Sequence, residues 1–133
     1  MSRDWVQDIQ EMHTKYGVRE VVRNFDALKL DTYLTFRANF LQEELDELKT
    51  SKNADDAVDA LIDLCVVAIG TLDAFGVDSY TAWDRVHKAN MNKEVGIKES
   101  RPNPLGLPDL IKPEGWTAPS HADNTALLEK IYD

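Results

Sequence analysis

The chain reads FLQEELDELKTSKNADDAVDALID from Phe40 to Asp63, and this stretch decides the fold. It contains two acidic clusters on two predicted helices, separated by the polar turn TSKN at residues 50–53. Glu44 and Glu47 are three positions apart, so on a helix their side chains lie on one strip of surface. Like charges stacked in this way are mildly unfavourable unless a cation neutralises them. Taken alone, this cluster is more typical of a solvated helix face, and the second cluster decides in favour of a cation.

The second acidic cluster lies in an apolar helix. From Ala57 to Leu72 the sequence is apolar on nearly every face, which is typical of a helix in the middle of a bundle. Asp59 and Asp63 share one face of this helix. A carboxylate there is costly when isolated, but it is satisfied when it faces other carboxylates and a divalent ion. The two clusters therefore predict a site for Mg²⁺ or Mn²⁺, because all the ligands on offer are oxygens.

Composition limits the class of protein. With 133 residues the chain is expected to form one domain over residues 1–133, with a helical core at about 4–96 and a tail at about 97–133. The formal charge of −9 argues against a nucleic-acid surface, which needs clustered Lys and Arg. A nucleotide substrate remains possible, because a bound metal reverses the local charge.

Cys65 is the single cysteine and lies in the apolar helix. We therefore expect a buried thiol, no disulfide within the chain, and a reducing compartment such as the cytoplasm. The first residues lack the pattern of a signal peptide, and no apolar run reaches the length of about 18 residues that spans a membrane. The sequence thus predicts a cytoplasmic protein without a membrane partner.

Hydrophobic spacing and capping residues predict four helices. They are expected at residues 4–16, about 31–49, 54–75 and about 80–95. Asp31 or Thr32 is expected to cap the second helix, and residues 18–30 to form a loop or short helical turn. The apolar stripe of the second helix is expected to consist of Leu34, Ala38, Leu41, Leu45 and Leu48.

A short connection makes the second and third helices antiparallel neighbours, so Glu44 and Glu47 are expected opposite Asp59 and Asp63. After Gly96 the composition changes to a segment with five prolines, which predicts an extended tail. The sequence therefore predicts an all-α fold, with an antiparallel core resembling a four-helix bundle and an extended proline-rich C-terminal tail.

Three motifs carry a resemblance to a known family. They are Glu44-x-x-Glu47, DALID at residues 59–63 and VHKANMNK at residues 86–93. In this order they resemble the all-α nucleoside triphosphate pyrophosphohydrolases of the MazG-like superfamily, which also holds phosphoribosyl-ATP pyrophosphohydrolases and dimeric-type dUTPases. The segment IKPEGWTAP at residues 111–119 is similar to the ending of small single-domain members, many of them borne by phages.

The resemblance implies a helical bundle that oligomerises and cleaves a (deoxy)nucleoside triphosphate between its α and β phosphorus atoms. The products are a nucleoside monophosphate and pyrophosphate. The resemblance maps Glu44, Glu47 and Asp63 to metal ligands. Ala60 stands where the family has a further Glu, so Asp59 or Asp56 would have to supply the fourth ligand.

Other residues receive roles in the expected hydrolysis. Glu43 neighbours the ligands without being needed as one, so we expect it to act as the general base. The fourth helix carries polar donors on one face that suit a phosphate chain. The residues expected to bind the substrate are Asn90, Lys93, His87, Arg37 and Lys112.

Two alternatives to this interpretation exist, one of them another enzyme and the other a non-catalytic protein. A di-iron carboxylate bundle needs two Glu-x-x-His motifs, whereas this chain has only Asp84-x-x-His87. A non-catalytic helical oligomer with a structural cation is the other alternative. The active form is expected to be a homodimer or homotetramer, because the third helix is apolar around its whole circumference. In such an oligomer, the tail near Lys112 is expected to reach a neighbouring subunit's nucleotide.

Overall fold

The computed structural model describes residues 3–106 and 108–132 and divides into two compact units. The second unit is Tyr80–Asp123, and the first contains the residues on either side of it. Helices dominate, and the strands that the described residues form are two of three residues each. The prediction of an all-α, bundle-like fold is confirmed. No described helix combines the length and the apolar character that crossing a membrane requires.

The first unit begins with two short helices, α1 (Trp5–Tyr16) and α2 (Val18–Val22). Asp4 caps α1 by accepting a hydrogen bond from the backbone N–H of Gln7 at 2.9 Å. Gly17 separates the two helices with a φ of 70°, a left-handed conformation that glycine adopts without steric cost. Residues 18–22 are thus the short helical turn that was one of the two expectations for this region.

Helix α3 (Ala27–Lys49) begins earlier than predicted. Its cap is Asp26, which accepts from the N–H of Lys29 at 2.9 Å, and not Asp31 or Thr32. Leu30 in its first turns is fully buried, so tertiary packing supports the additional turn. The predicted stripe is also wrong at Ala38, which is exposed, while Leu34, Leu41, Leu45 and Leu48 are half-buried.

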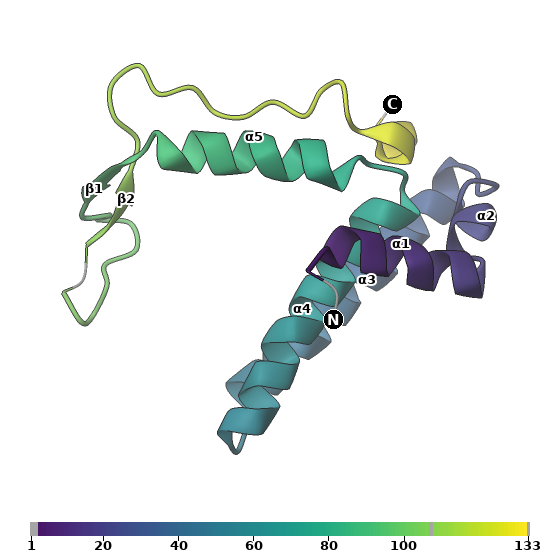
Figure 1. Cartoon of the computed structure of the whole chain (residues 1–133), viewed down its shortest axis with the longest axis horizontal. Coiled ribbons are helices and arrows are strands. Elements are labelled where there is room, and N and C mark those ends of the chain that lie inside the picture. Colours follow the sequence, from purple (N-terminus) through teal and green to yellow (C-terminus); the bar gives the residue numbers. More distant parts are fainter. Residues whose placement is uncertain (1–2, 107, 133) are drawn as a thin grey trace. The chain divides into compact units, whose positions relative to one another are not determined.

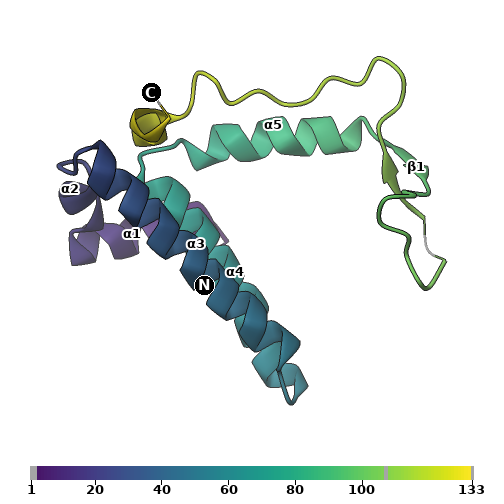
Figure 2. The ribbon, with the colours of Figure 1, turned by 180° about the vertical axis from the view of Figure 1, so that it is seen from behind.

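Helices α3 and α4 (Ala54–Ala74) form an antiparallel hairpin, which both views show as two rods side by side (Figures 1 and 2). Asn53 caps α4 by accepting from the N–H of Asp56 at 2.8 Å. Helix α1 packs on α4, and the core of this unit lies at the end of the hairpin away from its turn. Its buried residues are Val22, Leu30, Ala74, Phe75 and Val77.

The C-terminal segment completes this core. A 3₁₀ helix, η1 (Ala126–Ile131), lies within the segment predicted as an extended tail, and Leu127, Leu128 and Ile131 pack against the buried cluster. The N–H of Leu127 donates to the carbonyl of Phe75 at 3.1 Å. The end of the chain is therefore part of the first unit's core.

A buried polar network joins α1, α2 and α4. Asp73 is 2% exposed, and its carboxylate accepts from the Nε of Arg19 at 3.0 Å and lies 2.7 Å from the Nδ1 of His13. Burial acts to raise the pKa of Asp73, but the hydrogen bonds from Arg19 and His13 outweigh it and hold the pKa below its ordinary value of 3.8. The charge of Asp73 is therefore stabilised inside an apolar helix.

This network predicts a pH-dependent stability. Because the folded pKa of Asp73 is depressed, its contribution is complete above 3.8 and is lost as the pH falls through the folded pKa. We expect Asp73→Asn to lower the free energy of unfolding by about 3 kcal/mol at neutral pH. The difference in the free energy of unfolding between wild type and variant, measured by urea unfolding, should decrease below about pH 4. The exposed Asp8→Asn is the control, and parallel pH profiles for wild type and Asp73→Asn would contradict the prediction.

The second unit contains most of α5 (Ser79–Met91) and a two-stranded antiparallel ribbon of β1 (Glu94–Gly96) and β2 (Asp109–Ile111). The prediction that the fourth helix continues to Val95 is wrong. Residues 94–96 pair with β2 instead, so Gly96 lies in a strand. A Cβ on Gly96 would lie 2.6 Å from the Cδ1 of Ile111, so glycine allows the close approach of this side chain.

Candidate functional site

The carboxylates predicted to form a metal site come from the two halves of the α3–α4 hairpin. Glu44 on α3 is 8% exposed, and Asp63 on α4 is half-buried. Glu47 and Asp59 are exposed at the same part of the hairpin. The structure thus brings together the four residues predicted as ligands, since their charges act on one another.

Two carboxyl groups of this cluster have pKa values above their ordinary range. Burial raises the pKa of Glu44 above 4.5, and the charges of Glu47, Asp63 and Asp59 add to this effect. Burial likewise raises the pKa of Asp63 above 3.8, together with the charges of Asp59 and Glu47. Glu44 and Glu47 approach closely within α3, as do Asp59 and Asp63 within α4. The hairpin therefore carries two facing pairs of mutually repelling acids.

One atom of this cluster has no partner. The Oε2 of Glu44 is buried and forms no hydrogen bond within the described chain. A buried acceptor without a partner costs about 1–3 kcal/mol, and more when the group is charged. A cation at this position would remove that cost and the repulsion between the acids. By contrast, Asp73 on α4 has Arg19 as its cation.

The two candidates for the fourth ligand, Asp59 and Asp56, differ in how they interact with the rest of the cluster. Ala60, which stands where the family has a Glu, is 2% exposed. Asp59 contributes to the pKa shifts of both Glu44 and Asp63, whereas Asp56 is not among the causes of either. Of the two residues that the sequence left open, Asp59 is therefore the one that interacts with the rest of the cluster.

The donor set fits a hard cation, because it consists of carboxylate oxygens. Within residues 3–106 and 108–132, no group of three or more His, Cys, Asp or Glu side chains is arranged so that it could hold a metal ion by itself. Mg²⁺ does not need such a set, since it keeps several waters and uses one or two carboxylates plus substrate phosphates. The cluster therefore fits an open cation site rather than a closed structural one.

Arg37 lies on the same hairpin but is held against α4. Its Nε donates to the Oγ1 of Thr71 at 2.9 Å, and its Nη2 donates to the carbonyl of Val67 at 3.0 Å. A Cβ on Gly70 would lie 2.9 Å from this Nη2, so the glycine makes room for the guanidinium. Arg37 therefore connects α3 to α4 through some of its N–H donors. Glu43, the expected general base, is exposed on α3 beside the acidic pairs.

The remaining predicted substrate-binding residues belong to the second unit, which is described by itself. His87 and Asn90 are exposed on α5, Lys93 is half-buried just before β1, and Lys112 is exposed just after β2. Lys93 and Lys112 both lie near the ring of Trp116. Their assignment to the phosphate chain stays a prediction.

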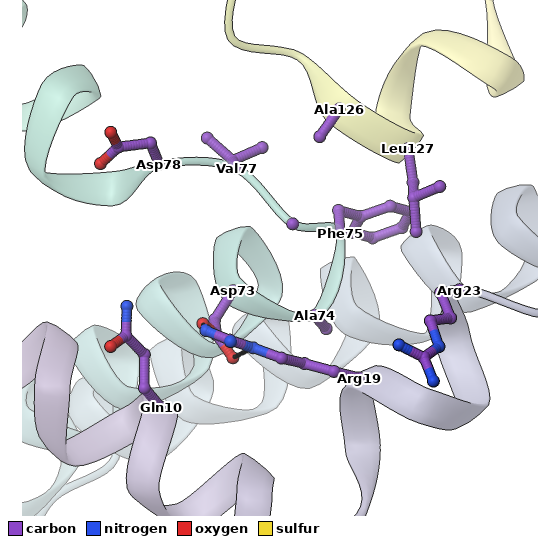
Figure 3. Close-up of a pocket in the computed structure, with 11 residues that line it drawn as sticks. Gln10, Arg19, Arg23, Asp73, Ala74, Phe75, Val77, Asp78, Ala126 and Leu127 are labelled. Atoms are coloured by element: carbon purple, nitrogen blue, oxygen red, sulfur yellow. Dashed lines mark hydrogen bonds and ion pairs between the residues drawn. The ribbon is translucent and has the colours of Figure 1, made fainter.

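A cavity of about 540 Å³ lies elsewhere in the first unit, at the C-terminal end of α4 (Figure 3). None of the predicted site residues lines it. Arg19 and Asp73 form one of its walls, and the ion pair between them is drawn in Figure 3. The sequence interpretation missed this pair, although the argument applied to Asp63, an acid within an apolar helix, applies to Asp73 as well.

Two facing carboxylate pairs on an antiparallel hairpin place this chain in the class of all-α proteins that have an acidic site between helices. A family model described as phosphoribosyl-ATP pyrophosphohydrolase matches residues 23–90, which cover α3, α4 and nearly all of α5. The chain belongs to this family, within the all-α MazG-like superfamily, and the sequence resemblance is confirmed. A comparison with curated proteins finds no match. Family membership makes the chain a pyrophosphohydrolase, a hydrolase of anhydrides.

Proposed function

We propose that the chain is a divalent-metal-dependent nucleoside triphosphate pyrophosphohydrolase. It cleaves a (deoxy)nucleoside triphosphate between the α and β phosphates to a nucleoside monophosphate and pyrophosphate. The proposal rests on the two acidic pairs that face each other across the hairpin. The pKa values of Glu44 and Asp63 are raised there, and one oxygen of Glu44 has no hydrogen-bond partner among the described residues. Perturbed carboxyl groups of this kind cluster at functional sites.

The chemistry follows from the roles of the residues. Glu44, Glu47, Asp59 and Asp63 would hold Mg²⁺ or Mn²⁺. The cation supplies charge neutralisation at the phosphates and a lowered pKa for a bound water. Glu43 accepts a proton as the water's oxygen bonds to phosphorus, and pyrophosphate leaves as the anhydride bond breaks. Binding of the phosphate chain is assigned to the donors Asn90, Lys93, His87, Arg37 and Lys112.

A nucleotide panel tests this proposal. The protein is incubated with each common nucleoside and deoxynucleoside triphosphate and Mg²⁺ or Mn²⁺, and pyrophosphate and monophosphate are measured. We expect turnover of at least one nucleotide with both products in equal amounts, and complete loss of turnover in excess EDTA. Release of orthophosphate alone would contradict the cleavage position, and full activity in EDTA would contradict the metal. Absence of turnover on the whole panel would favour the non-catalytic oligomer.

We also propose that the active form is a homodimer or homotetramer. Helix α4 exposes a row of large apolar side chains, Val58 at 61%, Leu61 at 50% and Ile62 at 44%. These residues follow helical spacing, so they lie on one face. A continuous apolar face of this kind is unusual on a monomer and is typical of an interface between copies.

A further inference from the structure

The ribbon of the second unit sets two lysines opposite each other. In its antiparallel register Glu94 pairs with Ile111, and Val95 pairs with Leu110. Continuing this register by one residue places Lys93 opposite Lys112. Like charges directly opposite on neighbouring strands are destabilising. The position therefore needs a compensating group.

Trp116 is one such group. Its ring centroid lies 5.4 Å from the Nζ of Lys93 and 5.2 Å from the Nζ of Lys112, both within the range of a cation–π interaction. The electron-rich ring thus attracts both ammonium groups at once. It compensates their repulsion only in part, because a cation–π contact at a partly exposed site is weak and leaves each charge in place.

Two hydrogen bonds donated by Trp116 fix its ring at this position. The Nε1 of Trp116 donates to the carbonyl of Ala89 in the last turn of α5 at 2.7 Å. The N–H of Trp116 donates to the carbonyl of Pro113 at 3.0 Å, which closes a turn, and Gly115 has a φ of 77° in it. A positive φ at the third position of such a turn favours glycine. The tail is therefore folded back onto α5 by defined contacts.

We infer that Trp116 is a positioning residue that holds Lys93 and Lys112 together as a binding site for an oligophosphate anion. Two ammonium groups beside one ring can contact neighbouring phosphates of a single chain. The anion would supply the negative charge that the ring does not. Only the identity of the natural ligand, the phosphate chain of a nucleoside triphosphate, rests on the proposed function.

The surroundings of Trp116 suit this ligand. A cavity of about 520 Å³ borders the ring and is also lined by Lys88 and Asn92, two further donors. Arg85 lines it as well but is ion-paired with Asp123 at 2.5 Å, and Glu114 is its acidic member. Although the chain carries a charge of −9, the second unit has as many basic as acidic side chains. The basic ones are Arg85, Lys88, Lys93, Lys98, Arg101 and Lys112, and the acidic ones are Asp84, Glu94, Glu99, Asp109, Glu114 and Asp123.

The test measures binding of inorganic tripolyphosphate to the full chain by isothermal titration calorimetry, in EDTA and without divalent metal. We expect Lys93→Gln, Lys112→Gln and Trp116→Leu each to weaken binding about tenfold, as loss of one charged contact does. Trp116→Phe keeps a ring and should restore part of the affinity. Equal affinities of Trp116→Phe and Trp116→Leu would show that an aromatic ring beside the two lysines contributes nothing to binding.

Two matched controls separate this site from general charge effects. Lys98→Gln removes a lysine from the same unit, and Trp83→Leu removes an exposed tryptophan from α5. Both should bind tripolyphosphate as the wild type does, with unchanged circular dichroism. No binding by the wild type, wild-type affinity in Trp116→Leu, or an equal loss in Lys98→Gln would each overturn the inference.

The same measurement separates this inference from the proposed function. Asp63→Asn should lose hydrolysis but keep tripolyphosphate binding, because the binding assay contains no metal. A wild type that binds tripolyphosphate but hydrolyses no nucleotide would overturn the proposed function alone. A wild type that hydrolyses nucleotides but does not bind tripolyphosphate would overturn this inference alone.

Discussion

Asp63→Asn is expected to lower kcat about 10³-fold while leaving a folded helical protein, an effect equivalent to about 4 kcal/mol of transition-state stabilisation. The substitution removes one carboxylate charge at nearly constant volume from the half-buried position that faces Glu44 and Glu47. Removal of that charge also relieves repulsion among the acids. The variant should therefore be at least as stable as the wild type when no metal is present.

The measurement is initial rate at saturating Mg²⁺, with thermal unfolding in EDTA as a check on the fold. Asp55→Asn is the matched control, because Asp55 is exposed in the first turn of the same helix and is not among the causes of either raised pKa. Asp59→Asn and Asp56→Asn compare the two candidates for the fourth ligand. Wild-type turnover by Asp63→Asn would show that the metal assignment is wrong.

Leu61→Glu is expected to convert the oligomer to a monomer. Leu61 is 50% exposed between Val58 and Ile62 on the apolar face of α4, and a carboxylate there would be buried without a partner in an interface. In a symmetric dimer the substitution occurs twice, so its cost is doubled. Light scattering at micromolar concentration should give a mass near 15.1 kDa for the variant and a multiple of it for the wild type.

Val21→Glu is the control for this experiment, because Val21 is 57% exposed on α2 and lies outside the proposed interface. It should keep the mass of the wild type. If the wild type is itself a 15.1 kDa monomer with full activity, the interface proposal fails. The acidic site would then have to work within one chain.

Local signals in the sequence located most of the helices. Helices are predicted at residues 4–16 and 54–75, and α1 and α4 lie there. Asp4 and Asn53 cap these helices and Gly17 ends α1, so residues close in sequence satisfy their free backbone groups. Two errors in the helix bounds have a tertiary cause. Helix α3 extends back to Ala27 because Leu30 finds a place in the core, and α5 ends at Met91 because the next residues pair with β2.

The sequence by itself predicted the hairpin and the facing of its two acidic clusters, because helical spacing and a short turn place Glu44 and Glu47 opposite the acids of the next helix. It left the fourth acid open between Asp59 and Asp56, and the structure favours Asp59. Only the tertiary structure decided how each acid of the apolar helix is satisfied. Asp73 has Arg19 and His13 as partners, whereas the charges that raise the pKa of Asp63 are those of the acids Asp59 and Glu47. A sequence pattern gives the face on which a side chain lies. Its partner comes from a distant part of the chain and is fixed only when the elements pack.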